Sequence, residues 1–199
     1  AASFALSRHI DPNNPRAVDT KNIKVEWPDF EKSVRETVPA FGNSNYSVLE
    51  TFYSNGVVDY GPAFGEMQSR LDRLVKQVAS STRTPLMTVL LEGTTGCGKT
   101  ALAAKVAHTS GYPFVRMISP DTMIGENEAG KCARLLKVFN DAYKSPLSMI
   151  FIDDIERLIE FTPVGMRFSN VILQTLLILL RKIPPKTCRL MVIGTTSVA

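Results

Sequence analysis

The sequence predicts an α/β fold in which a parallel β-sheet is covered by helices on both faces. Four short runs rich in Val, Ile, Leu and Met are typical of strands buried on both sides, and helical patterns lie between them. A glycine-rich segment separates the first run from the next helical pattern. The expected strands are 86–91, 113–118, 148–152 and 189–194, and the helices between them are 99–109, about 129–143 and about 168–182.

The part of the chain before the first expected strand is predicted to contain a linker followed by three helices. Residues 1–28 are polar and contain several prolines, which is typical of a linker or the end of a preceding module. Apolar residues at helical spacing predict a helix over 28–38, with Asp29 as a possible cap. A short helix is expected near 45–55, and a longer amphipathic helix begins at Phe64.

Composition excludes several classes of protein. Charged residues make up 21% and apolar residues 44% of the chain, and the net charge is +4, which is the balance of a soluble globular domain. Because the basic residues are scattered, we expect an ordinary solvated surface and no nucleic-acid partner. No apolar stretch is long enough to predict a membrane span, and the first residues do not resemble a signal peptide.

The cysteines and histidines argue against a zinc site. Cys97, Cys132 and Cys188 are widely spaced, and His9 and His108 are the histidines of the chain. An odd and sparse set of cysteines is typical of a reducing compartment, so we expect a cytoplasmic location.

The glycine-rich segment matches the Walker A pattern, Gly93-x4-Gly98-Lys99-Thr100, between a strand and a helix. Glycines let such a loop turn its N–H groups inward on phosphates, and the following helix directs its positive end at the same charge. Lys99 is expected to reach the β and γ phosphates, and the Thr100 hydroxyl to bind Mg²⁺. The segment therefore predicts a P-loop NTPase that binds ATP with Mg²⁺, rather than a glycine-rich turn with a surface lysine. The expected contacts are Thr95, Gly96, Cys97, Gly98, Lys99, Thr100, Ala101 and Leu102.

A second nucleotide motif, SMIFIDDIE, follows at 148–156. Asp153 is placed to hold Mg²⁺ through water as the Walker B acid. Without the Walker A motif, the alternative would be an exposed acid at the end of a strand. Asp154 stands where many NTPases carry a glutamate that activates water, and its side chain is one methylene shorter. Since a misplacement of roughly an ångström can cost on the order of 10²-fold in rate, we expect good ATP binding and weak hydrolysis. The alternative is that Asp154 or Glu156 suffices.

With both motifs placed, the chain resembles the AAA ATPases, and within them the second ATPase module of the vesicle-fusing ATPases. Matching stretches include GKTALAAKVA (98–107), SPDTMIGENEAGKC (119–132), DDIERL (153–158), RFSNVILQTLLILL (167–180) and LMVIGTTS (190–197). The resemblance implies a homo-hexameric ring that disassembles SNARE complexes with a SNAP adaptor and meets membranes only through its partners. In that ring the second module mainly binds ATP and supports the hexamer.

The resemblance also implies roles for individual residues. Ser197 falls at the sensor position after the fourth strand, where it would act with Lys99 and Asp154 in catalysis. Met123 and Ile124 replace the aromatic residue with which AAA motors usually grip a threaded chain, although Met123 also suits a core contact. Alkylation of Cys97 would block the phosphate pocket, unless this cysteine is only a small filler. The adenine is expected to be wrapped by NGVVDY, that is Asn55, Gly56, Val57, Val58, Asp59 and Tyr60, although the two valines also suit a core.

The chain departs from the family pattern at its C-terminal end, because the sequence ends shortly after the fourth strand. We expect 1–28 to be a linker or the end of a preceding module, and 29–199 to be an AAA domain truncated after that strand, without the helical lid. Such a fragment is expected to bind nucleotide more weakly and to be a monomer or loose oligomer. The open alternatives are an AAA remodeller of other protein complexes and a nucleotide-binding scaffold without turnover.

Overall fold

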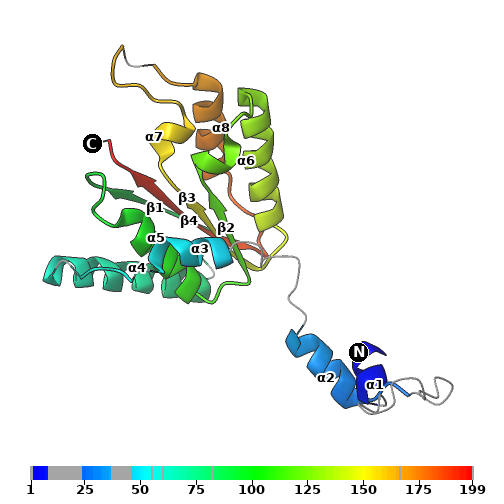
Figure 1. The fold of residues 1–199 in the computed structure, drawn as a ribbon. Helices are drawn as coiled ribbons and strands as arrows, with labels where there is room; N and C mark the ends of the chain where they lie inside the picture. Colours follow the sequence, from blue (N-terminus) through cyan, green and yellow to red (C-terminus); the bar gives the residue numbers. More distant parts are fainter. Residues whose placement is uncertain are drawn as a thin grey trace. The chain divides into compact units, whose positions relative to one another are not determined.

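The structure is a computed structural model, and it describes residues 2–8, 24–36, 46–54, 56–59, 61–81, 83–165 and 167–198. The chain divides into two compact units, residues 1–40 and 41–199. The first contains helices α1 (Ala2–Arg8) and α2 (Trp27–Glu36), which contact each other (Figure 1). The helix predicted at 28–38 is therefore confirmed as α2, and the buried Asp29 accepts a hydrogen bond from the Glu26 N–H at its start. The division after residue 28 stays a prediction.

The predicted parallel sheet is confirmed in the second unit. In the described residues it has four strands in the order β1-β4-β3-β2. All pairs are parallel, so the carboxyl ends of the strands meet at one edge of the sheet. The strands are β1 (Leu86–Glu92), β2 (Phe114–Ile118), β3 (Leu147–Ile152) and β4 (Arg189–Thr196), each within two residues of its predicted bounds.

Alternate side chains of the two central strands pack into two separate cores. Met149 and Phe151 of β3 face the core that contains residues of α4 and α5, whereas Ile150 and Ile152 face the core of α6 and α8. Because β3 is buried on both faces, its sequence is continuously apolar rather than alternating. Helices therefore cover both faces of the sheet, as predicted (Figure 1).

The helices of this unit begin and end close to the predicted positions. Asn127 caps α6 and Ser169 caps α8 through side-chain oxygens that accept backbone N–H groups of the first turn. No described helix combines the length and apolar content that crossing a bilayer requires. The helices are α3 (Tyr46–Tyr53), α4 (Pro62–Ser80), α5 (Lys99–Thr109), α6 (Glu128–Ala142), α7 (Ile155–Leu158) and α8 (Asn170–Arg181), with the 3-10 turn η3 (Pro120–Met123).

Two buried tyrosine hydroxyls provide a test of these cores. The Tyr112 hydroxyl donates to the Val75 carbonyl oxygen of α4 at 2.7 Å, whereas the Tyr143 hydroxyl is buried without a hydrogen-bond partner in the described part of the chain. We expect Tyr112→Phe to lower the free energy of unfolding by about 1 kcal/mol. Tyr143→Phe is expected to leave it unchanged or to raise it, because no hydrogen bond is lost. Chemical denaturation of the two variants measures this difference, and equal losses would contradict it.

Candidate functional site

The loop between β1 and α5 has a shape that requires glycine. Gly96 and Gly98 adopt φ angles of 84° and 85°, in the left-handed region where a Cβ atom is strained. At Gly93, an added Cβ would lie 3.0 Å from the Cys97 sulfur atom. Each glycine of the predicted Walker A pattern thus has a local steric reason. Gly98 directly precedes the first residue of α5.

The same loop presents donors that fit an anion. The N–H groups of Gly96, Gly98 and Lys99 donate to no acceptor in the described part of the chain. The Lys99 Nζ donates to the carbonyl oxygens of Gly93 and Thr94, both at 2.9 Å, so the ammonium group lies against the loop. Unpaired amides, a helix N-terminus and a cation around one turn form the arrangement that binds phosphate groups.

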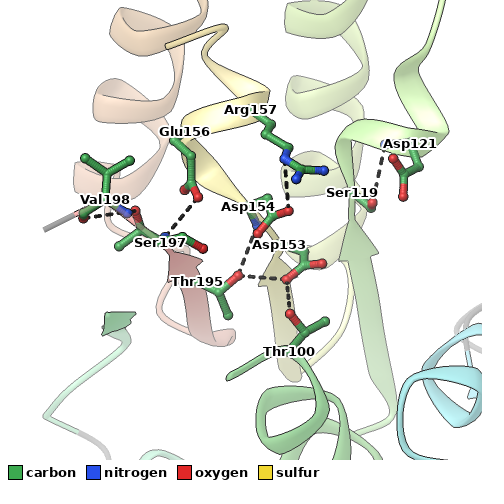
Figure 2. A network of polar contacts seen from close by, with 11 residues as sticks. Thr100, Ser119, Asp121, Asp153, Asp154, Glu156, Arg157, Thr195, Ser197 and Val198 are labelled. Atoms are coloured by element: carbon green, nitrogen blue, oxygen red, sulfur yellow. Dashed lines mark hydrogen bonds and ion pairs between the residues drawn. The ribbon is translucent and has the colours of Figure 1, made fainter. Parts of the chain in front are cut away.

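The predicted metal pair is brought together at the carboxyl edge of the sheet. The Thr100 Oγ1 donates to the Asp153 Oδ1 at 2.9 Å across 53 positions of sequence, and Asp153 is only 7% exposed (Figure 2). A hydroxyl and a carboxylate are oxygen ligands of the kind that Mg²⁺ prefers. Among the described residues, no group of three His, Cys, Asp or Glu side chains could hold a metal by itself. The site therefore fits an Mg²⁺ ion that shares its coordination with phosphate oxygens and water.

Thr195 lies beside Thr100 and Asp153, and no motif in the sequence marks it as a site residue. Its hydroxyl donates to the Asp153 Oδ1 at 2.7 Å and accepts the Asp154 N–H at 3.0 Å, and the side chain is completely buried. The register pairs Ile152 with Gly194, which sets Thr195 beside Asp153 (Figure 2). The available signal was a threonine at the carboxyl end of a strand adjacent to the Walker B strand.

Asp154 has an unusual backbone and a perturbed carboxyl group. Its φ of 45° and ψ of 63° are left-handed, a conformation that Asp and Asn tolerate better than most residues. Burial raises the pKa of Asp154 above its ordinary value, and the nearby carboxylates of Asp153 and Glu156 raise it further, against the opposing charges of Arg157 and Lys99. A raised pKa makes this carboxylate a stronger base than an exposed aspartate.

Glu156 has a different role in the same cluster. Its Oε1 accepts the Ser197 N–H at 2.9 Å, which ties the first turn of α7 to the end of β4 (Figure 2). Burial would raise the pKa of Glu156, but hydrogen bonds from its own backbone and from Thr196 and Ser197 outweigh burial and lower the pKa. Glu156 is therefore engaged with the turn that carries the predicted sensor Ser197.

The segment predicted to wrap the adenine is only partly described. Asn55 and Tyr60 lie outside the described residues. Val57 is half-buried and Val58 is 61% exposed, so neither belongs to the buried core, while the Asp59 Oδ1 accepts the Gly61 N–H at 2.9 Å. The adenine role of residues 55–60 stays a prediction.

Two cavities help to locate the site. A cavity of 460 Å³ borders the glycine loop, and it is lined by Cys97 and Lys99 together with apolar side chains of α4 and β1 such as Phe64 and Leu74. A larger cavity of 780 Å³ lies between α3, β2 and α6, and none of the predicted nucleotide residues lines it. The cavity at the loop, and not the larger cavity, therefore adjoins the predicted nucleotide residues.

The remaining predicted contacts differ in exposure. Thr95 and Cys97 are exposed and Ala101 is half-buried, whereas the Leu102 side chain is 1% exposed and packs in the core, so only its backbone is available to a ligand. In the MIG turn, Met123 is buried among core residues, which agrees with the core interpretation, while Ile124 is 82% exposed.

Comparisons with known proteins agree with this geometry. Residues 89–199 match the family described as "ATPase family associated with various cellular activities (AAA)". Over 99% of its length the chain is 47% identical to a vesicle-fusing ATPase of Dictyostelium discoideum and 50% identical to one of Arabidopsis thaliana. It is 39% identical to the vesicular-fusion protein SEC18 of Saccharomyces cerevisiae. The chain spans about a quarter of the length of each relative, namely 27%, 26% and 26%.

The raised pKa of Asp154 predicts a pH-dependent stability difference. The ionised carboxylate is penalised in the folded protein at neutral pH, and the penalty is lost as the pH falls through the raised pKa towards 3.8. We expect Asp154→Asn, which tolerates the left-handed backbone, to be slightly more stable than the parent at pH 7. The advantage should shrink in acid. Thermal unfolding from pH 7 to pH 4 measures it, and a variant that is less stable at pH 7 would contradict the prediction.

Proposed function

Because the chain belongs to the ATPase family associated with various cellular activities (AAA), we propose that it is an ATP-binding module of the vesicle-fusing type. It binds ATP with Mg²⁺, hydrolyses it weakly and supports assembly of a hexameric ring. The observation that carries this proposal is the 2.9 Å hydrogen bond between Thr100 and Asp153. It joins the end of the phosphate loop to the acid after β3, as a P-loop NTPase requires.

The residues of the chain divide the binding task between them. Backbone N–H groups of the loop and the Lys99 ammonium would hold the phosphate oxygens, and the Lys99 Nζ would exchange its contacts with the Gly93 and Thr94 carbonyls for phosphate. Thr100 and Asp153 would hold Mg²⁺, directly and through water. When bound with ATP, Mg²⁺ supplies charge neutralisation for the phosphate oxygens.

Weak hydrolysis follows from the position of Asp154. Its backbone N–H is held by Thr195, and its Oδ2 lies 3.5 Å from the Nε of Arg157. A short carboxylate on a backbone held in this way has little freedom to compensate for the missing methylene. Glu156 is held through its Oε1 by the Ser197 N–H, and its Oε2 is buried without a hydrogen-bond partner among the described residues, so neither oxygen is available to activate water. The same observations favour, as a second candidate, a nucleotide-binding scaffold without turnover.

The wider role is proposed from the similarity to vesicle-fusing relatives, which extends over 99% of this chain. We propose that the chain acts in the cytoplasm within a homo-hexamer that disassembles SNARE complexes with a SNAP adaptor. Ser197 would sense the γ phosphate, and residues 55–60 would wrap the adenine. A pull-down with SNAP-bound SNARE bundles separates this role from remodelling of other complexes, because only the first predicts ATP-dependent capture.

The binding proposal predicts a selective effect of Lys99. Lys99→Ala should weaken binding of a fluorescent ATP analogue in Mg²⁺ roughly 10- to 100-fold, because charge-assisted hydrogen bonds to phosphate are lost. Lys105→Ala, which removes another lysine of α5, is the matched control and should leave the affinity unchanged. Equal affinity of the Lys99 variant and the parent would contradict the proposal.

The hydrolysis proposal predicts a gain of function. Asp154→Glu restores the missing methylene and should raise the single-turnover rate of ATP hydrolysis on the order of 10- to 100-fold. Lys99→Ala in the same background should remove the gain, which excludes a contaminating ATPase. Brisk hydrolysis by the parent that Asp154→Asn abolishes would show that the short carboxylate suffices and would overturn the weak-site proposal.

A further inference from the structure

We propose that Thr195 is a positioning residue that holds Asp153 and Asp154 in place for the metal of the bound nucleotide. The inference rests on the proposed function, since it concerns the same ATP–Mg²⁺ site. Thr195 belongs to the carboxyl end of β4, two residues before the predicted sensor Ser197, and it contacts both members of the acidic pair (Figure 2).

The direction of the hydrogen bonds defines what Thr195 does to Asp153. A threonine hydroxyl has one proton, and here that proton is donated to the Asp153 Oδ1 at 2.7 Å. Thr100 donates to the same oxygen at 2.9 Å. The Oδ2 of Asp153 accepts no hydrogen bond from the described residues. Two hydroxyls thus hold one carboxylate oxygen and leave the other for water or metal.

The lone pairs of the same hydroxyl act on Asp154. Thr195 accepts the Asp154 N–H at 3.0 Å, at the residue whose φ is 45°. A non-glycine residue in this region needs support from its surroundings. Since the Thr195 side chain is completely buried, removal of its hydroxyl leaves the Asp154 N–H and the buried Asp153 carboxylate each with one partner fewer.

The surroundings of Thr195 confine the effect of a substitution to its hydroxyl. The backbone of β4 is paired on both sides, with β1 and with β3. At the preceding Gly194, an added Cβ would lie 2.6 Å from the Cδ1 of Ile155, so the strand and α7 are in close contact. Valine, which has the shape of threonine, therefore removes the hydroxyl with little change in packing.

The test compares Thr195→Val, Thr195→Ser and Thr195→Cys with the parent. Affinity for fluorescent ATP is measured with Mg²⁺ and with EDTA, and thermal unfolding is measured for each protein. We expect the parent to bind more tightly in Mg²⁺, and Thr195→Val to reduce that gain about tenfold while its affinity in EDTA changes less than about twofold. Serine should restore the gain. Cysteine is a weaker donor and should give a gain in Mg²⁺ between those of the parent and the valine variant. If the valine variant does not fold, the cysteine variant provides the comparison.

Thr175→Val is the matched control, because its hydroxyl bonds the Val171 carbonyl of α8 and the Cys132 sulfur atom and lies outside this network. It should match the parent in both conditions. The inference is overturned if Thr195→Val keeps the parent's Mg²⁺ gain, if it loses affinity equally in EDTA, or if serine does not restore the gain. A parent that binds no ATP would instead overturn the proposed function, and the inference with it.

Discussion

The hydrogen bond between Thr100 and Asp153 is the contact on which the rest of the site depends. It joins the first turn of α5 to the end of β3, two points that the chain separates by 53 positions. The parallel sheet brings these ends to one edge, because every strand finishes on the same side. The continuously apolar strands and the helices on both faces are therefore the structural condition for this contact.

The acidic residues at this edge of the sheet differ from one another in burial, hydrogen bonding and pKa. Asp153 is buried and accepts two hydroxyl protons, and Asp154 is partly buried with a raised pKa. Glu156 has a lowered pKa because backbone and hydroxyl groups donate to it. Neighbouring carboxylates whose environments give them different pKa values can take different roles in a reaction. Here Asp153 would hold the metal and Asp154 would face the reaction, whereas Glu156 fixes the turn that carries Ser197.

Much of the site was predictable because its signals are local. The strand before the glycine loop and the helix after it, the left-handed glycines and the acid after β3 each depend on a few consecutive residues. The buried position of Met123 was predictable only as one of two alternatives, since a turn residue can face either the core or solvent. Thr195 was not singled out, because a threonine at a strand end has many ordinary uses.

The sequence by itself determined the α/β class, the positions of the strands and of the main helices that cover the sheet, and the Walker A and B motifs, because hydrophobic periodicity, glycine spacing and acids at strand ends are all properties of short segments. Only the tertiary structure decided which side chains meet. The strand order β1-β4-β3-β2 and its register place Thr195 beside Asp153 and bring the end of β4 within reach of Glu156. These are properties of neighbouring strands and of packing, which no short segment contains.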